Sequence, residues 1–432
     1  MQIALKNNTI KIAAMTLGVA VFILLSVCIV RAYFATLIAE KPTARNLQTS
    51  IRLDPYNAEY ALNLGRLHQY SVLEARPDLA IQELSRSVHL NVYSPQAWLD
   101  LGKAYEYQGD TAKAAACMHR ASALAPSIPT YQWAIGNFFL LHGQVDEAFQ
   151  HFKMVLAADR DQGPIYNTAW KASGDASKIL AELIPESSYS ELQYLNYLVS
   201  THRVDDAQPV WDRIAKSPEK FSASSVSPYM DALIIGQKPK LAYQVWTALR
   251  EKSLIPATYE ALPQNLVENG DFENQLLNMG FDWRLAPVNG IYVGYDDSTF
   301  HSPGHSLLIQ FPGTQNFDYH QFYQFVPVEP GRVYRLQAFM KTEGITTDSG
   351  PRIEVRDTYD SRLLDTYTDS MTGTSTSWVP VSLDFKTSRK TRLVDIFIAR
   401  PPSEHFDNQI AGKVWVDDVS LTLASNGGVV AN

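Results

Sequence analysis

Cysteine and clustered positive charge are both scarce in this sequence. Its 432 residues include two cysteines, Cys28 and Cys117, and its formal net charge is -8. Cys28 lies in an apolar N-terminal stretch and Cys117 in a helical one, so we predict no disulfide between them. Because the chain has no long basic run, nucleic acid is not an expected partner. Hydrophobic residues at 46% and charged residues at 19% are typical of folded protein, and the length predicts two or three domains.

Sequence motifs of enzymes are missing as well. The chain has no Gly-rich phosphate loop, nucleophile elbow or helical zinc motif. His301 and His305 are four residues apart, but Pro303 and Gly304 between them exclude a helical metal pair. Acidic residues gather over 357–369, where paired carboxylates could hydrolyse a glycoside. They are Asp357, Asp360, Asp365 and Asp369. We predict that the protein is not an enzyme and has no catalytic cofactor; a glycan-processing enzyme is an alternative.

One long hydrophobic run is present, near the N-terminus. Residues 12–30 carry no charge over 19 positions, close to the roughly 20 apolar residues with which a helix crosses a bilayer. Lys6 and Lys11 precede the run and favour a cytoplasmic N-terminus over residues 1–11. We therefore predict a single-pass transmembrane anchor over 12–31, with the bulk of the chain in the periplasm or outside the cell.

Two alternatives stay open for this segment. A cleaved signal peptide would have a shorter apolar region and a small-residue cleavage site. Leu25-Ser26-Val27-Cys28 resembles the lipoprotein box of bacteria, with Val27 where that family has a small residue. The length of the apolar run makes an uncleaved anchor the favoured interpretation.

Small and large residues follow a helical pattern from Trp98 to Pro126. The stretch reads Trp-x-x-Leu-Gly-x-x-Tyr, followed by Gly109, Ala114 and Ala121. Small residues fall where two antiparallel helices must touch, and large ones where they fill the space between. This resembles one tetratricopeptide repeat, a helix-turn-helix unit of about 34 residues.

Equivalent glycines mark three successive repeats: Gly65, Gly102 and Gly136. The last two are 34 residues apart (136 − 102), whereas the first two are 37 apart (102 − 65), which predicts a three-residue insertion between Ser71 and Pro77. A single repeat cannot bury its own apolar face, so neighbours must stack on it. We therefore predict an α-solenoid over 42–255.

Weaker repeats flank the clearest ones, which lie over 58–159. Upstream, Leu47 and Ile51 look like the closing half of a partial repeat that continues from the membrane helix. Downstream, 164–183 is typical of a shorter helix pair broken at Gly174. Two degenerate units follow. Their spaced residues are Tyr194, Leu198, Ala207, Trp211 and Ile214, then Tyr229, Leu233, Ala242 and Trp246.

In repeats of this kind the first helix of each pair lines a concave groove. The phase of the Trp98 unit assigns eleven residues to that face, and exposed tyrosine, tryptophan and arginine are the types that anchor peptide partners. The residues are Leu62, Arg66, Gln69, Tyr70, Leu99, Lys103, Glu106, Tyr107, Trp133, Asn137 and Leu141. We predict a protein partner in this groove; the alternative is that these side chains only solvate it or contact a neighbouring domain.

Beyond the helices, the hydrophobic period changes from 3.6 to 2. Pro256 and Pro263 interrupt any helix, which predicts a linker over 256–263. Short alternating segments separated by turn residues then predict an all-β sandwich over 264–425. The clearest segments are Val333–Phe339, Ile353–Arg356, Val379–Phe385 and Leu393–Ile398. We expect residues 426–432 to form a disordered tail.

Several motifs in this region occur in a characteristic order. Asn265-Leu-Val-Glu-Asn-Gly-Asp-Phe-Glu273 opens it and Val414-Trp-Val-Asp-Asp-Val-Ser-Leu421 closes it, with His305-Ser306-Leu307 and Gln324–Val328 between them. Together they resemble carbohydrate-binding modules of the family 4/9/22 type. The resemblance implies a β-jelly roll similar to galactose-binding-like domains. The expected fold is therefore multidomain α and β: a transmembrane helix, a TPR-type α-solenoid and a C-terminal β-jelly-roll sandwich.

The same resemblance implies a structural calcium ion between the first and last strands. Its ligands would be Glu273 and Asp417, with Asp296, Asp297 or main-chain carbonyls near His305 completing the shell. Calcium takes roughly six to eight oxygen ligands, which carboxylates on rigid strand ends can supply. The alternative is that Glu273 accepts hydrogen bonds from main-chain amides without a metal.

Sugar binding needs aromatic rings for the C–H faces of the sugar and planar polar groups for its hydroxyls. The candidates are Tyr292, Tyr295, Tyr319, Gln321, Tyr323, Arg356 and Tyr359. We expect Trp283, Trp378 and Trp415 to be packing residues instead. Because a fold does not establish a function, a protein-docking or stabilising sandwich is an alternative.

Together these features predict a membrane-anchored, non-catalytic scaffold. The TPR array would bind a protein partner and the sandwich would contact a polysaccharide, a combination that suits assembly or export of cell-surface polysaccharide in a bacterium. The main alternative is a purely protein–protein assembly factor whose sandwich recognises no sugar.

Overall fold

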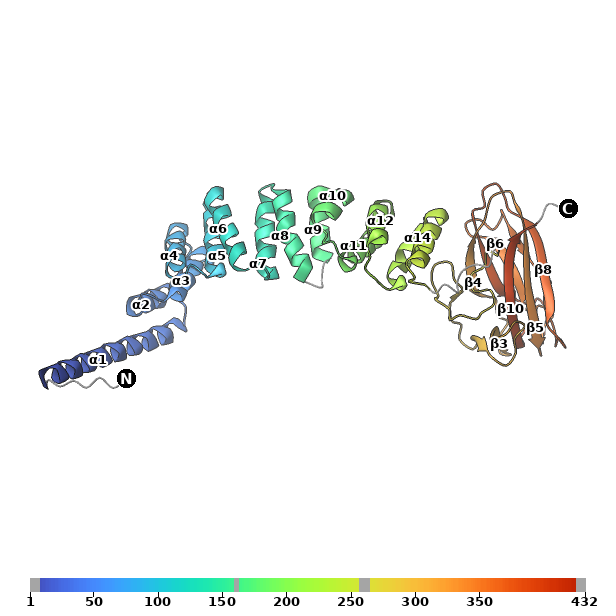
Figure 1. The fold of residues 1–432 in the computed structure, drawn as a ribbon, viewed down its shortest axis with the longest axis horizontal. Coiled ribbons are helices and arrows are strands. Elements are labelled where there is room, and N and C mark those ends of the chain that lie inside the picture. The colour runs from blue at the N-terminus through green and yellow to red at the C-terminus, as the bar shows by residue number, and fades with distance from the viewer. Residues whose placement is uncertain (1–7, 159–162, 256–264, 425–432) are drawn as a thin grey trace. The chain divides into compact units, whose positions relative to one another are not determined.

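The computed structural model describes residues 8–158, 163–255 and 265–424. Its contacts divide the chain into two compact units, Met1–Pro185 and Glu186–Asn432. The described part of the first unit is helical, and that of the second holds α11 to α14 and two antiparallel sheets (Figure 1). The predicted fold class is therefore confirmed. The predicted linker, the predicted tail and residues 1–7 lie outside the described residues.

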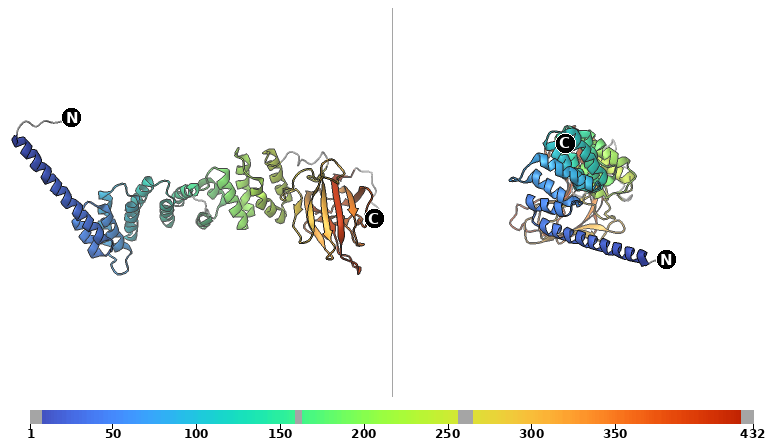
Figure 2. Two further views of the ribbon diagram at one scale, coloured as in Figure 1. Left: turned by 90° about the horizontal axis from the view of Figure 1, so that it is seen from below. Right: turned by 90° about the vertical axis from the view of Figure 1, so that its left-hand side faces the viewer.

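Helices α1 to α10 form the first unit and pack mostly as consecutive antiparallel pairs (Figures 1 and 2). Polar side chains begin several of them: Ser94 caps α5 and Asp110 caps α6 by accepting N–H groups of the first turn. The helices are α1 Asn8–Ala39, α2 Ala44–Leu53, α3 Ala58–Tyr70, α4 Pro77–Leu90, α5 Pro95–Tyr107, α6 Thr111–Leu124, α7 Pro129–Leu141, α8 Val145–Ala158, α9 Gly163–Ser173 and α10 Ala176–Glu182.

Glycine allows the two helices of each clear repeat to approach closely. A Cβ atom at Gly65 would lie 2.6 Å from Leu84 Cγ, and one at Gly136 would lie 2.5 Å from Phe152 Cε1. Real Cβ atoms essentially never make such contacts, so only glycine fits at the present helix separation. The predicted insertion is also present, because α3 ends at Tyr70 and α4 begins at Pro77, where proline occupies the first helical turn.

The apolar N-terminal run forms the greater part of α1, which continues beyond the predicted anchor to Ala39. Residues Lys11–Ala39 are long and apolar enough to cross a membrane. The last turns of α1 pack on α2 and α3 in a buried cluster that completes the predicted partial repeat. The cluster consists of Ala35, Leu47, Ile51, Tyr60 and Leu64.

The second unit begins with two more helix pairs. They are α11 Ser188–Ser200 with α12 Gln208–Lys216, and α13 Ser227–Ile235 with α14 Pro239–Glu251; short 3-10 turns, Val204–Ala207 and Ala223–Val226, precede α12 and α13. The spaced residues predicted for these units form their core. Tyr194, Leu198, Trp211, Leu233 and Trp246 are all buried.

Ten strands of the described chain form two five-stranded sheets. Sheet A has the order β1-β4-β9-β6-β7 and sheet B the order β2-β3-β10-β5-β8. Alternate residues, such as Phe322 and Ile396 of sheet A and Ile309 and Val414 of sheet B, fill the core between them. The strands are β1 Arg284–Leu285, β2 Tyr292–Asp296, β3 Ser306–Pro312, β4 Tyr319–Pro327, β5 Val333–Glu343, β6 Arg352–Asp357, β7 Asp365–Tyr367, β8 Val379–Lys386, β9 Leu393–Arg400 and β10 Ala411–Leu423.

The opening motif of the sandwich runs beside its last strand, as predicted. Leu266 N–H donates to the Leu421 carbonyl at 2.9 Å, and Val419 N–H donates to the Gly270 carbonyl at 2.8 Å. A Cβ atom at Gly270 would lie 2.0 Å from the Val419 carbonyl oxygen. Main-chain pairing therefore joins the two ends of the sandwich sequence and explains why the motif needs glycine there.

We predict that Gly136→Ala destabilises the first unit although alanine is the better helix former. Overpacking costs about 1–3 kcal/mol, whereas the gain in helix propensity is at most about 1 kcal/mol. The melting midpoint of the full chain in detergent, followed by circular dichroism at 222 nm, should fall. The double variant Gly136→Ala/Phe152→Leu should lose less than the sum of its single changes. A midpoint at or above that of the parent chain would contradict the close approach.

Candidate functional site

A groove in the first unit collects side chains from three successive first helices, α3, α5 and α7. It encloses about 690 Å³. Predicted residues dominate its lining, and Tyr107 and Leu141 are 77% and 81% exposed. The lining residues are Gln69, Tyr70, Lys103, Glu106, Tyr107, Met118, Trp133, Ala134, Asn137, Phe138 and Leu141. The repeat pattern therefore predicted most of the residues from α3, α5 and α7 that line the groove.

Arg66 was predicted to line the groove, but its side chain forms an ion pair within the helix stack instead. Its Nε atom lies 2.9 Å from Asp100 Oδ2, and the Asp100 side chain is buried. Gln96 donates to the same carboxylate oxygen at 2.8 Å. Burial raises the pKa of Asp100, which these two partners partly offset. Arg66 thus compensates a buried carboxyl group within the repeat stack.

Tyr70 remains a neutral hydrogen-bonding phenol inside the groove. Burial, followed by the charge of Asp100, raises the pKa of Tyr70 to about 12. Lys103 and Glu106 add one charge of each sign, and Glu106 Oε1 lies 3.9 Å from His142 Nδ1. The groove therefore offers aromatic surface with paired charges, which suits an extended peptide better than a strongly charged ligand.

Two predicted groove residues are corrected by the structure. Leu62 and Leu99 are buried in the stack and not in the groove, because they lie on the side of the first helix that faces its neighbours. Three lining residues were missed. Ala134 and Phe138 lie on α7 next to predicted positions, and Met118 comes from α6, a second helix that the groove pattern did not consider.

The sugar candidates of the sandwich do not form one site. Tyr319 is buried in the core against Phe311, with ring centroids 5.9 Å apart, so it cannot stack on a sugar. Tyr292 and Tyr295 lie on sheet B. Tyr295 packs on Phe272, and its hydroxyl donates to the Asn274 carbonyl at 2.6 Å. The period-2 pattern could not reveal which sheet each strand would join.

Two more candidates have structural partners. The Tyr359 hydroxyl donates to the Ile234 carbonyl at the end of α13 at 2.9 Å, so Tyr359 docks the sandwich on a helix. Gln321 lies where the β4–β9 register shifts, and its side-chain oxygen accepts the N–H of His320 at 2.9 Å. Tyr323 and Arg356 are the remaining candidates, and both lie on the outer face of sheet A.

Across sheet A, four outward residues form a row perpendicular to the strands, which we call the aromatic row. Tyr323 of β4 lies opposite Phe397 of β9, Phe397 opposite Glu354 of β6, and Glu354 opposite Tyr367 of β7. The Tyr323 and Phe397 rings are 5.5 Å apart. The row places two accessible rings, Tyr323 and Tyr367, on either side of the buried Phe397 ring and Glu354 carboxylate. Accessible aromatic rings can stack on the C–H faces of a sugar.

Glu354 is the electrostatic centre of the aromatic row. Its buried carboxylate receives His320 Nε2 at 3.3 Å, Arg352 Nη2 at 3.3 Å and Arg356 Nη2. Burial alone would raise the pKa of Glu354, but the His320 hydrogen bond and the Arg356 charge outweigh it and lower the pKa to about 2. The Arg352 guanidinium also lies 3.5 Å from the Tyr367 ring centroid. The carboxylate is thus ionised and fixed in place.

Sequence reasoning missed Arg352, Glu354, Phe397 and Tyr367. A usable signal was present, because Arg352, Glu354 and Arg356 alternate with Ile353 and Val355 and so share one face of β6. Phe397 carried no such signal. It lies in an almost continuously apolar strand, in which inward and outward residues look alike.

The predicted calcium ligands hold a loop through main-chain amides. Asp417 Oδ2 accepts the N–H groups of His301 at 2.7 Å and Ser302 at 3.0 Å, and Glu273 Oε1 accepts the N–H of His305 at 2.9 Å. Asp296 instead binds Ser298 and the indole of Trp415, and Asp297 is not among the groups that hold this loop.

The Glu273 and Asp417 carboxylates both accept main-chain N–H groups in this arrangement. Among the described residues, no three His, Cys, Asp or Glu side chains are placed to hold a metal ion. The predicted alternative, amide hydrogen bonds from the loop to Glu273, describes this geometry, and a calcium ion at these residues stays a prediction.

The acidic stretch over 357–369 has structural contacts in the described sandwich. Asp357 Oδ1 accepts the N–H groups of Tyr359 at 2.9 Å and Asp360 at 3.0 Å. Asp360 pairs with Arg362, and Asp365 lies opposite Arg356. These carboxylates stabilise the turn between β6 and β7.

The sandwich and α14 meet at a buried polar contact within the second unit. Glu268 of the opening motif accepts Arg250 Nη2 at 2.5 Å and the Trp246 indole N–H at 3.2 Å. Gln324 binds the main chain of Glu268 on the other side. Phe281 packs on Tyr243 with centroids 5.1 Å apart. Removing one partner of such a buried pair typically costs about 3–5 kcal/mol.

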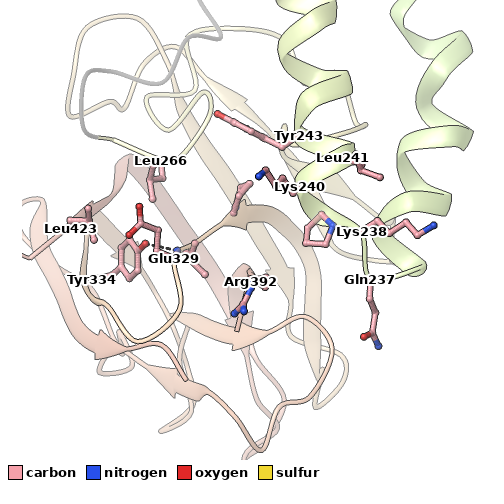
Figure 3. A pocket seen from close by; sticks show the side chains of 13 residues that line it. Gln237, Lys238, Lys240, Leu241, Tyr243, Leu266, Glu329, Tyr334, Arg392 and Leu423 are labelled. Atoms are coloured by element: carbon pink, nitrogen blue, oxygen red, sulfur yellow. Dashed lines mark hydrogen bonds between the residues drawn. The ribbon is translucent and has the colours of Figure 1, made fainter. Parts of the chain in front are cut away.

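Beside this contact lies a pocket of about 650 Å³, lined by the start of α14 and by loops and strand ends of the sandwich (Figure 3). Its polar atoms are largely engaged: the Tyr334 hydroxyl accepts Glu329 N–H at 2.7 Å, and Arg392 donates to main-chain carbonyls. Leu266, Val328 and Leu423 contribute apolar surface. The pocket thus lies between α14 and the sandwich, with Lys238 and Lys240 on its helical side.

Comparison with known proteins supports the helical repeats. The tetratricopeptide repeat family matches residues 99–163. No curated protein matches the chain. Among solved structures, MamA is 19% identical over 40% of this chain and 84% of its own, with a TM-score of 0.24. Pseudomonas aeruginosa pilF is 15% identical over 54% and 93%, with a TM-score of 0.27. A CBM4 structure is 15% identical over 37% and 99%, with a TM-score of 0.25. Likenesses this low carry no functional argument.

We predict that Asp282 makes the second unit less stable as the pH rises. Burial raises the pKa of Asp282 to about 7, although main-chain N–H groups of Leu277 and Trp283 oppose the rise. Because the folded pKa lies above that of the unfolded chain, this stabilisation is complete below about pH 4 and is lost as the pH rises through 7. Within that window the loss is about 1.4 kcal/mol per pH unit.

The measurement is urea unfolding of the full chain in detergent from pH 4.5 to 7.5, followed by tryptophan fluorescence. Asp282→Asn should flatten the pH dependence of the midpoint relative to the parent chain. Asp297→Asn, an exposed change, should leave it as it was. Parallel pH profiles for the parent chain and Asp282→Asn would contradict the burial argument.

Proposed function

We propose that this protein is a membrane-anchored, non-catalytic scaffold. Its α1 helix would cross the membrane once, with a cytoplasmic N-terminus and the two units in the periplasm or outside the cell. Its TPR groove would hold a segment of a protein partner, and its sandwich would contact a polysaccharide. Assembly or export of bacterial cell-surface polysaccharide is the setting that this combination suits.

The observation that carries the proposal is the convergence of the groove side chains. Tyr70, Tyr107 and Trp133 come from three repeats, yet they line one hollow with Lys103 and Glu106 between them. Exposed aromatic surface of this kind is costly in water unless a partner covers it, and aromatic side chains dominate binding energy at protein interfaces. A peptide lying across the first helices would bury all three rings together.

The groove is tested by photo-crosslinking in the native membrane. A photoreactive residue in place of Tyr107 should capture a discrete protein, whereas the same residue in place of Arg120, exposed on α6 outside the groove, should not. Adding Lys103→Ala and Tyr70→Ala should reduce capture, because two interface anchors contribute about 1.4 kcal/mol or more, roughly tenfold in affinity. Arg66 is left unchanged because its loss would unpair Asp100. Equal capture at both positions would refute the groove as the binding site.

The sugar-binding part of the proposal is supported by the aromatic row. Tyr323 and Tyr367 flank an ionised, fixed carboxylate, with Arg352 and Arg356 beside it. Rings can stack on sugar C–H faces while the part-exposed Arg356 guanidinium donates to hydroxyls, and the buried Glu354 carboxylate holds Arg352 and Arg356 in place. The row spans four strands and is therefore suited to several units of a chain-like glycan.

A glycan array probed with the full chain in detergent tests this surface. Tyr323→Ala with Tyr367→Ala should weaken binding to the best glycan about tenfold, since each aromatic contact contributes about 0.5–1.5 kcal/mol. Tyr292→Ala, which removes an exposed tyrosine from sheet B, is the matched control and should bind as the parent chain does. Loss of binding with Tyr292→Ala alone would move the site to the other sheet.

A purely protein-binding assembly factor is the second candidate. Contacts between the sandwich and α13 favour it, because Tyr359 binds the Ile234 carbonyl and Arg284 pairs with Asp231 at 2.6 Å. A sandwich used for docking in this way needs no sugar. A chain that binds no glycan on the array but retains crosslinking at Tyr107 would select this candidate.

A further inference from the structure

We infer that two turns at the base of the first unit lie in the headgroup layer of the bilayer that α1 crosses. These basal turns are Asp54–Asn57, between α2 and α3, and Asn91–Ser94, between α4 and α5. The inference rests on the proposed anchor and adds a lipid-contacting surface to it. Contacts of α1 with the first repeats determine where that surface lies.

The first basal turn lies level with the end of the apolar run. Ser50 Oγ donates to the Ala35 carbonyl at 2.7 Å, and Arg31 Nη2 donates to the Arg52 carbonyl at 3.0 Å. Helix α2 therefore runs antiparallel to α1, back toward the membrane. At about 1.5 Å per residue, the Tyr56 position falls beside the last turn of the apolar run, just before Arg31.

The second basal turn lies on the same edge of the helix stack. Arg86 Nη2 donates to the Pro55 carbonyl at 3.2 Å, and Ser87 Oγ donates to the Ala58 carbonyl at 3.0 Å. The end of α4 is thus held against the first basal turn. Because α4 runs antiparallel to α3, the residues that follow α4 continue in the direction of the bilayer.

The exposed side chains of this edge are those found at membrane interfaces. Tyr56 is 84% exposed and Tyr93 is 75% exposed, and Tyr33 of α1 is also exposed at the same end. Tyrosine is enriched at the headgroup level, where its ring is embedded and its hydroxyl stays in contact with water. In water these rings would have no partner within the described unit that covers them.

Charge contributes little to the proposed contact between the basal turns and the bilayer. Arg31, Arg52 and Arg86 on the basal edge are opposed by Asp54 and Glu59, which leaves one net positive charge. We therefore expect the contact in a neutral phosphatidylcholine bilayer, without a requirement for anionic lipid. This separates the surface from a polybasic patch, which would need anionic headgroups.

The opposite edge of the same repeats supplies a matched control. Val72 and Leu73, in the turn between α3 and α4, are 97% and 94% exposed. They are as apolar as the basal residues, but α3 carries them away from the bilayer. A general attraction of apolar side chains to lipid would bring both edges into the bilayer, whereas the inferred contact brings only the basal turns into it.

The test uses single spin labels on the full chain in phosphatidylcholine nanodiscs. In a Cys28→Ser/Cys117→Ala background, Tyr56→Cys, Tyr93→Cys and Val72→Cys are labelled in turn, and a fourth protein retains Cys28 as a reporter of the anchor. Accessibility to oxygen and to a water-soluble nickel chelate is measured for each. We expect labels at 56 and 93 to be several-fold more accessible to oxygen than to nickel, and the label at 72 to show the reverse.

The experiment distinguishes failure of the bilayer contact at the basal turns from failure of the α1 membrane anchor. If the labels at 56 and 93 have the same accessibility as the label at 72 while Cys28 reports lipid, the bilayer contact of the basal turns is overturned and the anchor stands. If Cys28 also reports water, both fail. Labels at 56 and 93 that are shielded from both reagents would indicate a protein contact, such as a second copy of this chain, and would overturn the lipid assignment.

Discussion

Every helical pair of this protein has an apolar face that it cannot bury alone, and the close approach of neighbouring helices is what buries it. Glycine at Gly65 and Gly136 brings the paired helices near enough for Leu84 and Phe152 to fill the space between them. Within each unit, each helical pair covers the apolar face of the pair before it. The end of α1 covers the first face of the stack.

The same requirement explains how the second unit is built. Its last helix has a buried tryptophan, Trp246, which packs on Phe281 and donates to Glu268. Both partners belong to the sandwich, so the sandwich occupies the place of a further repeat. Arg250 neutralises the buried Glu268 carboxylate at this contact. The helix pairs and the sheets therefore form one compact body, although their folds are unrelated.

The two proposed binding surfaces differ in how far local sequence pattern defines them. The groove depends on one helical phase, which recurs at Tyr70, Tyr107 and Leu141 with spacings of 37 (107 − 70) and 34 (141 − 107) residues, so the pattern alone places these three positions together. The aromatic row depends on which strands become neighbours in sheet A. Strand alternation assigns a residue to one of two faces but does not say which face becomes the core, and Tyr319 was misplaced for that reason.

Local periodicity determined the apolar N-terminal helix, the repeat spacing and the insertion before Pro77, and the resemblance carried by short motifs implied the pairing of the opening motif with β10. These features depend on neighbours close in the chain or on main-chain pairing that glycine marks. Only the tertiary structure decided which tyrosines share a surface, that Glu273 and Asp417 bind loop amides, and that the sandwich packs on α14. Such outcomes depend on contacts between residues far apart in sequence, where burial and competing partners determine what each side chain does.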